Sequence, residues 1–358
     1  MKVLFIVRST LFTVKGGDTI QVTETAAHLK QLGVGVDVIE TKRTIDYSRY
    51  DLLHFFNIIR PADILVHIER SQKPFVISPI LVDYSEYDKL HRKGLAGKLF
   101  KWLPPAGIEY VKTIYRAARR KDVLASTSYL WQGQQRSIKK ILAQTKCVLV
   151  NAEDEYRQLV KDHKVSPSFM LVPNGININL FKPVINLKKE KQLVLCVARI
   201  EGIKNQYNLI KALNNTKFKL VLIGDAAPNQ QNYYTLCKKI AAANISFIDH
   251  LPQQQLLNYY AAAKVHVLPS WFEVCGLSSL EAAAMGCEIV ITDNGYARSY
   301  FNDEAFYCDP AEPVSILEAV EKAAGNSSNT ILQNRIHDQY SWRQTAEKVL
   351  SAYQKFVV

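Results

Sequence analysis

The stretch that decides the fold runs from Val265 to Gly286 and reads VHVLPSWFEVCGLSSLEAAAMG. Its short β-branched and apolar beginning predicts a buried strand. Glu273 follows on a loop, and Gly276 permits a tight approach of the backbone. A helix is expected to begin near Ser278, which stands three residues before Glu281, the spacing of a capping box.

This stretch places a helix N-terminus beside two carboxylates. Backbone N–H groups and the helix dipole hold phosphate at such a terminus, whereas Glu273 and Glu281 would repel it. Carboxylates accept hydrogen bonds from hydroxyl groups, so a ligand with central phosphates and a polyol on each side satisfies both features. A nucleotide-sugar is such a ligand. In the simpler alternative, Glu281 only caps its helix and Glu273 is a solvated loop residue.

The length and composition of the chain predict two soluble domains. A chain of 358 residues exceeds one typical domain. No apolar run reaches the roughly 18–20 residues of a membrane span, and the apolar run at the start is too short for a signal peptide. The six cysteines form no Cys-x-x-Cys pair, which favours buried thiols in a reducing cytoplasm. We therefore expect a cytoplasmic protein.

Strand and helix signals alternate along the whole chain, which indicates an α/β fold with doubly wound parallel sheets. The second series begins with a strand at Leu193–Val197, and the polar, lysine-rich residues 186–191 are expected to link the two series. Ligands of such sheets bind beyond the carboxyl ends of the strands, so two sheets that face each other would form a cleft. The predicted parts are Rossmann-like domains at 1–183 and 184–340 and a C-terminal helix at 341–358.

A basic, aromatic segment, residues 80–141, interrupts the alternation. Residues 89–121 contain ten lysines and arginines against the single acid Glu109. Such a surface suits an acceptor that carries phosphate or an anionic membrane surface; the alternative is a solvated charged face. Nucleic acid is not expected, because basic charge alone is non-specific. The basic patch is predicted at Arg116, Arg119, Arg120 and Lys121.

Two cations and a glycine pair are candidates for holding a diphosphate. Arg199 and Lys204 follow the first strand of the second series, at the same sheet edge as Gly276. A guanidinium and a flexible ammonium there form a diphosphate clamp, or are plain surface cations. Gly16-Gly17 opens a helix after the first strand, where phosphate can approach, although a plain turn explains it too. The histidines show no metal-ligand spacing, so we expect no metal and no cofactor.

Several stretches of the second half occur together in one known family. They are Leu171–Asn177 with Phe181, Val197–Arg199 with Lys204, Leu222–Asp225, Tyr259–Ala263, Leu268–Ser270, and Glu273 through Glu281. Over about residues 165–310 the chain resembles the retaining glycosyltransferases of family 4, which have the GT-B fold, and the two acids are the most specific mark. The helix that follows Ser341 resembles the closing helix of that family, which crosses back to the first domain.

The resemblance implies a role for each matching residue. Glu273 would accept hydrogen bonds from the hydroxyls of the donor sugar, and Glu281 from the ribose. Arg199 and Lys204 would hold the diphosphate, and the leaving phosphate would help to deprotonate the acceptor on the same face, without a metal ion or a protein nucleophile. The catalytic candidates are Glu273, Arg199 and Lys204; the other donor-binding candidates are Gly17, His250, Val274, Cys275, Gly276, Leu277 and Glu281.

The first domain departs from the family pattern. Ile77–Ile80 stands where the family often has a Thr-x-His motif, whose region supplies a histidine beside the transferred sugar. Asp83 and His91 are the candidates for the acceptor side in its place.

The leading hypothesis is a hexosyltransferase that moves a sugar from a nucleotide-diphosphate-sugar to a glycan or a lipid-diphosphate-linked acceptor in bacterial surface polysaccharide assembly. It would be cytoplasmic and peripheral at the inner face of the membrane. The alternatives are a nucleotide-sugar epimerase or hydrolase of the same fold, and a non-catalytic nucleotide-sugar-binding subunit.

Overall fold

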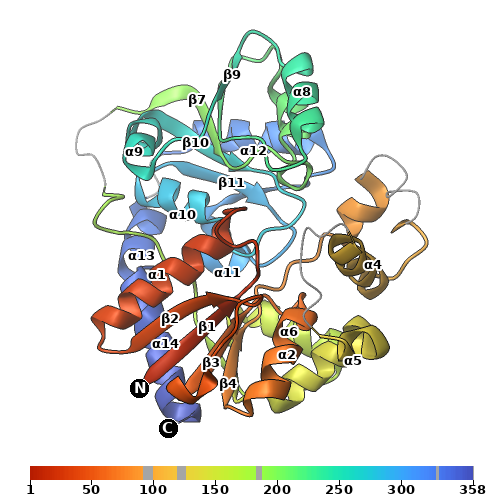
Figure 1. Cartoon of the computed structure of the whole chain (residues 1–358). Helices are drawn as coiled ribbons and strands as arrows, with labels where there is room; N and C mark the ends of the chain where they lie inside the picture. The colour runs from red at the N-terminus through yellow and green to blue at the C-terminus, as the bar shows by residue number, and fades with distance from the viewer. Residues whose placement is uncertain (92–99, 119–125, 183–187, 328–329, 358) are drawn as a thin grey trace. The chain divides into compact units, whose positions relative to one another are not determined.

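The computed structural model describes residues 1–91, 100–118, 126–182, 188–327 and 330–357. The chain forms two compact units, of which the first comprises Met1–Asn174 and Trp342–Val358 and the second comprises Gly175–Ser341. Each unit contains a six-stranded sheet whose paired strands are all parallel (Figure 1). The chain is therefore an α/β protein with two Rossmann-like domains, as predicted.

The sheet of the first unit has the strand order β2-β1-β3-β4-β5-β6. The strand β1 (Lys2–Val7) lies one place in from the edge and pairs with β2 on one side and with β3 on the other. Since each connection crosses over through helix or loop, every strand ends at the same edge of the sheet. The other strands are β2 (Gly35–Glu40), β3 (Leu52–Phe56), β4 (Phe75–Ser78), β5 (Cys147–Val150) and β6 (Phe169–Leu171).

Helices pack on both faces of the first sheet. Val3 and Phe5 of β1 belong to the core that contains side chains of α1 (Gly17–Gln31) and α14 (Trp342–Phe356). Leu4 of the same strand points to the opposite core, because successive strand residues alternate between faces. The remaining helical segments are η1 (Tyr47–Arg49), α2 (Pro61–Ser71), η2 (Tyr87–His91), α4 (Pro105–Ala118), α5 (Ser128–Gln144) and α6 (Glu153–His163).

The sheet of the second unit has the order β12-β11-β10-β7-β8-β9. Its interior strand β10 (Ala263–Leu268) is buried at all six residues, as a strand covered on both faces must be. The other strands are β7 (Glu190–Val197), β8 (Lys219–Ile223), β9 (Ile245–Ile248), β11 (Glu288–Thr292) and β12 (Phe306–Cys308). The helical segments are η3 (Gly202–Lys204), α7 (Gln206–Leu213), α8 (Gln231–Ile240), α9 (Gln253–Ala262), α10 (Leu277–Ala284), α11 (Arg298–Phe301), η4 (Asn302–Glu304), α12 (Pro313–Gly325) and α13 (Thr330–Gln339).

The first boundary between the units differs from the predicted one. The chain enters the second unit after Asn174, ahead of the predicted division at residue 183. The Ile176 N–H donates to the Tyr340 carbonyl at 2.8 Å, and Phe181 is fully buried in the second core. The segment before the lysine-rich stretch is therefore part of the second unit. Of that stretch, residues 186 and 187 lie outside the described residues, and β7 already begins at Glu190.

A buried polar network fixes the last helix to the first sheet. His54 on β3 is fully buried, with Nδ1 at 2.7 Å from the Tyr353 hydroxyl of α14 and Nε2 at 2.9 Å from Ser78 Oγ. Burial lowers the pKa of His54 to about 3, so the ring is neutral near pH 7. Both ring nitrogens have a partner, which is what a buried polar group requires.

Replacing Tyr353 tests this network. We expect Tyr353→Phe to lower the free energy of unfolding of the first unit by about 1–3 kcal/mol, because His54 Nδ1 loses its hydrogen bond to Tyr353 in a buried site. Urea denaturation followed by circular dichroism measures the loss. Tyr110→Phe is the control, because the Tyr110 hydroxyl donates to the Leu130 carbonyl in an exposed position. Equal losses in the two variants would contradict the role of the buried network.

Candidate active site

Two of the predicted charged residues meet at the carboxyl edge of the second sheet. Lys204 lies in η3, beyond the end of β7, and Glu273 lies in the loop after the neighbouring strand β10. The Lys204 Nζ donates to Glu273 Oε1 at 2.5 Å, and the Ser270 hydroxyl donates to the same oxygen at 2.6 Å. Glu273 is thus a buried, ion-paired carboxylate and not a solvated loop residue. The structure thus brings these two predicted residues into direct contact.

Hydrogen bonds also fix the backbone of Glu273. Its N–H donates to the Asn294 carbonyl at 3.1 Å, and its carbonyl accepts from the Tyr296 N–H at 2.8 Å. Gly295 lies between them with φ of +113°, and a Cβ there would stand 2.1 Å from the Glu273 carbonyl oxygen. Only glycine fits this approach. The loop after β11 is therefore a part of the site that sequence analysis missed; an Asn-Gly pair directly after a strand is the signal that points to it.

The helix that carries Glu281 begins at Leu277, one residue before the predicted Ser278. The N-cap of α10 is Gly276 with φ of +66°, and no side chain caps that end. The predicted capping box is therefore wrong, because the turn into the helix requires the left-handed conformation that glycine supplies. Val274 and Cys275 of the approach loop are buried, and Leu277 is the first helical residue. This arrangement leaves the N-terminus of an eight-residue helix beside Glu273.

Glu281 faces α9, where both of its hydrogen-bond partners lie. Its two carboxylate oxygens accept from the Tyr260 hydroxyl and from Gln253 Nε2, each at 2.9 Å. Burial raises the pKa of Glu281 to about 7, and the two hydrogen bonds oppose that shift. Tyr260 and Gln253 are two further residues that sequence analysis missed. Glu281 is therefore a buried network residue, and the simpler hypothesis of a helix cap is wrong for it.

Arg199 and His250 lie on loops at the same edge. Arg199 follows β7, and its guanidinium forms an ion pair with Glu201 at 2.8 Å, remaining partly exposed. The His250 N–H, beyond β9, donates to Asp225 Oδ1 at 2.9 Å, and the His250 side chain is exposed. These contacts place both residues beyond strand ends, as predicted. They show no contact of either residue with Lys204 or Glu273.

In the first unit, arginines lie beyond the carboxyl ends of β1 and β3. Arg8 follows β1 and donates to both oxygens of Asp18, at 2.7 and 3.1 Å. Arg60 precedes α2 and pairs with Asp63 at 3.2 Å. Burial lowers the pKa of Arg60, Asp63 opposes that shift, and the positive charges of Arg116 and Arg8 add to it. The Arg60 guanidinium therefore lies within electrostatic range of Arg8 and Arg116, of which only Arg116 was singled out from the sequence.

The other first-unit candidates are placed as follows. Gly17 is the first residue of α1, whose N-cap is Gly16, so the glycine pair does open a helix. Asp83 accepts from the Ser85 N–H at 2.8 Å in an exposed turn. His91 ends η2, and its side chain is not described. Arg119, Arg120 and Lys121 of the predicted basic patch lie outside the described residues.

Within the described residues, histidine, cysteine, aspartate and glutamate form no group of three that could hold a metal ion. No helix among them combines the length and apolar character that crossing a bilayer requires.

Comparisons with known proteins agree with this geometry. Residues 177–340 match the family described as "Glycosyl transferases group 1". The D-inositol 3-phosphate glycosyltransferase of Corynebacterium diphtheriae is 22% identical over 385 residues, which cover 94% of this chain and 89% of the relative.

Solved structures share the fold along the whole chain. Sucrose-phosphate synthase from Thermosynechococcus elongatus has a TM-score of 0.76 at 17% identity, with 99% of each chain covered. HepE from Anabaena, solved in complex with UDP-glucose, has a TM-score of 0.66 at 16% identity, with 98% of this chain and 100% of that chain covered.

The paired Rossmann-like units and the matched domain define a glycosyltransferase of the GT-B fold. The match over the second unit and the full-length relatives support the resemblance to family 4 glycosyltransferases that the motifs implied.

The pKa of Glu281 makes stability depend on pH. Its folded pKa of about 7 exceeds the ordinary value of 4.5, so the native state binds more protons between these values and stability falls as pH rises through that window. We expect Glu281→Gln, which cannot ionise, to make the free energy of unfolding less dependent on pH. Between pH 5 and 8 this free energy should exceed that of wild type by roughly 1–3 kcal/mol. Urea denaturation at several pH values measures this difference. An unchanged slope would show that Glu281 does not titrate in this range.

Proposed function

We propose that the protein transfers a sugar from a nucleotide-diphosphate-sugar with retention of configuration. The observation that carries the proposal is the Lys204–Glu273 pair beside the N-terminus of α10. An ammonium and free helix N–H groups suit a diphosphate, and a fixed carboxylate suits sugar hydroxyls. UDP-glucose is the first donor to test, because HepE binds it within the same fold.

The proposed chemistry needs charge stabilisation and positioning. An acceptor hydroxyl oxygen forms a bond to the anomeric carbon while the bond from that carbon to the diphosphate oxygen breaks. The hydroxyl proton passes to the leaving phosphate on the same face. Arg199 and Lys204 would stabilise the negative charge that develops on the diphosphate, and Glu273 would orient Lys204 and the sugar. The anomeric configuration of the product, determined by NMR, tests retention.

We further propose that the acceptor carries phosphate. Arg8, Arg60 and Arg116 bring three positive charges to the carboxyl edge of the first sheet, against Asp18 and Asp63. Guanidinium groups bind phosphate with two parallel hydrogen bonds. The relative from Corynebacterium diphtheriae is named for D-inositol 3-phosphate, a phosphorylated polyol. A phosphorylated sugar or polyol and a lipid diphosphate of surface polysaccharide assembly share this chemistry.

Donor binding is tested by thermal shift with a panel of nucleotide-sugars. At a donor concentration of about 100 Kd, binding stabilises the native state by about 2.7 kcal/mol and raises Tm by roughly 5–10 °C. Glu281→Ala and Lys204→Ala should lose most of this shift, while Glu318→Ala, an exposed acid on α12, should retain it. A full shift in the Lys204 and Glu281 variants would place the donor elsewhere.

Release of free sugar at the same rate with and without acceptor would favour the hydrolase hypothesis.

The acceptor hypothesis is tested with Arg116→Gln. We expect the KM for a phosphorylated acceptor to rise about tenfold, because one charged hydrogen-bond donor is lost, with the KM for the donor unchanged. Steady-state kinetics with matched phosphorylated and unphosphorylated acceptors measures the difference. Arg136→Gln, an exposed arginine on α5, is the control. Equal effects on both acceptors would contradict phosphate recognition by this cluster.

A further inference from the structure

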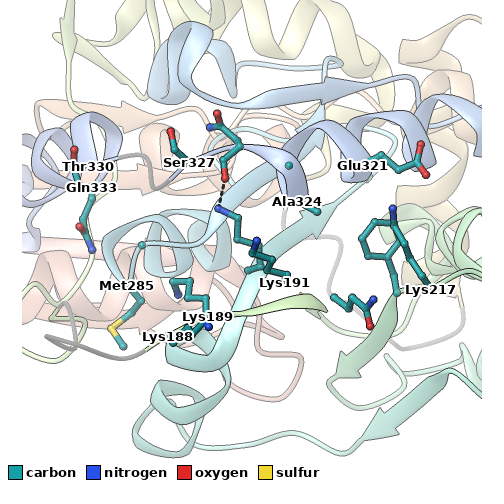
Figure 2. A pocket seen from close by; sticks show the side chains of 16 residues that line it. Lys188, Lys189, Lys191, Lys217, Met285, Glu321, Ala324, Ser327, Thr330 and Gln333 are labelled. Atoms are coloured by element: carbon teal, nitrogen blue, oxygen red, sulfur yellow. Dashed lines mark hydrogen bonds between the residues drawn. The ribbon is translucent and has the colours of Figure 1, made fainter.

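A cavity of about 950 Å³ lies in the second unit, on the side of its sheet where the strands begin (Figure 2). Its walls include Lys191 of β7, Lys264 of β10 and Gly286 ahead of β11. Arg199 and Glu273 follow the opposite ends of β7 and β10. β7 has 8 residues, and a rise of roughly 3.3 Å per residue separates the two edges by about 25 Å. The cavity is therefore distinct from the proposed donor site.

Positive charge dominates this cavity. Among the described residues that line it, the acid is Glu321, on α12. The other charged lining residues are five lysines: Lys188, Lys189, Lys191, Lys217 and Lys264.

Two of the lysines hold the ends of helices. Lys189 Nζ donates to the carbonyls of Tyr260 and Ala261, in the last turn of α9, at 2.8 and 3.2 Å. Lys264 Nζ donates to the Asn326 carbonyl, at the end of α12, at 2.8 Å, and lies 3.4 Å from Glu288. Cations at helix C-termini satisfy carbonyls that lack helical partners. Structural needs therefore account for these two lysines.

The other three lysines have no such explanation. Lys188, Lys191 and Lys217 are exposed, and within the described part of the chain none of them forms an ion pair. Lys217 Nζ lies 5.3 Å from the centroid of the Phe218 ring, which also lines the cavity. Like charges that converge on one cavity repel one another, so an anion between them would relieve this repulsion.

The wall of the cavity near the start of α13 supplies hydrogen-bond donors. Ser327 and Thr330 contribute hydroxyl groups, and Thr330 is the first residue of α13. Gln333 is fixed by a 3.0 Å hydrogen bond from Nε2 to the Ala284 carbonyl. Figure 2 shows Thr330 and Gln333 on one side of the view and Lys217 on the other, with Lys188 and Lys191 between them. An anionic ligand would thus contact lysines in the middle and hydroxyl groups at one end.

We propose that this cavity binds a small soluble ligand that carries two or more phosphate groups. Lysine presents a point charge on a flexible stem, so three separated lysines suit several separate phosphates better than one carboxylate. The volume suits a ligand of nucleotide size, since small-molecule sites range over roughly 300–1,000 Å³. A membrane surface is flat and would leave a cavity of this volume unfilled.

Tripolyphosphate is the probe that tests the proposal. Isothermal titration calorimetry on the full chain at low ionic strength should detect binding that weakens with salt. The variant K188Q/K191Q/K217Q should bind at least tenfold more weakly. The control K211Q/K238Q/K239Q removes the same charge from α7 and α8, outside the cavity, and should bind as wild type does. Thermal denaturation verifies that both variants fold.

A second pair of variants separates binding in this cavity from binding at the proposed donor site. In R199A/K204A, tripolyphosphate should still bind, and the added triple substitution at 188, 191 and 217 should abolish that binding. The proposal is overturned if R199A/K204A alone abolishes binding, or if the triple variant and its control bind equally. It is also overturned if the chain binds anionic phospholipid vesicles through these lysines and does not bind tripolyphosphate.

Discussion

The ion pair between Lys204 and Glu273 is the interaction on which the second unit's site depends. It joins two loops that are 69 residues apart in the chain, and it can form because β7 and β10 are neighbours in a parallel sheet. Parallel neighbours end at the same edge, so the groups that follow them lie within reach of each other. The Ser270 hydroxyl then fixes the carboxylate, and the close approach of Gly295 fixes the backbone of Glu273.

The two acids of the motif illustrate how environment separates similar groups. Glu273 is paired with an ammonium, whereas Glu281 accepts from a tyrosine hydroxyl and an amide and has its pKa raised to about 7 by burial. A carboxylate that is paired with a cation keeps its charge compensated while the pair binds a charged ligand. A carboxyl group whose hydrogen-bond partners are neutral side chains can accept hydrogen bonds from ligand hydroxyls only if it gives up one of those partners. Buried polar groups need a partner in every state, so ligand hydroxyls would replace Tyr260 or Gln253.

The first unit uses buried polar groups for a different purpose. His54, Ser78 and Tyr353 form a neutral network that attaches the end of the chain to β3. Charged groups concentrate instead at the carboxyl edge, where Arg8 and Arg60 each have an aspartate partner. The paired aspartates limit repulsion among the guanidinium groups, which leaves a moderate excess of positive charge there. A moderate excess suits a ligand that must bind and then leave.

The sequence alone determined the class of the fold, because hydrophobic periodicity and turn residues act over a few neighbouring positions. The alternation of elements, the all-buried strand β10 and the loop position of Glu273 followed from such local signals. Tertiary structure decided which groups meet. The partners of Glu281 lie 21 and 28 residues away on α9, and the lysines of the cavity come from three separate strand beginnings. The boundary after Asn174 likewise depends on a hydrogen bond from Ile176 to Tyr340. Strand order brings these residues together, and strand order is not encoded in any short stretch of sequence.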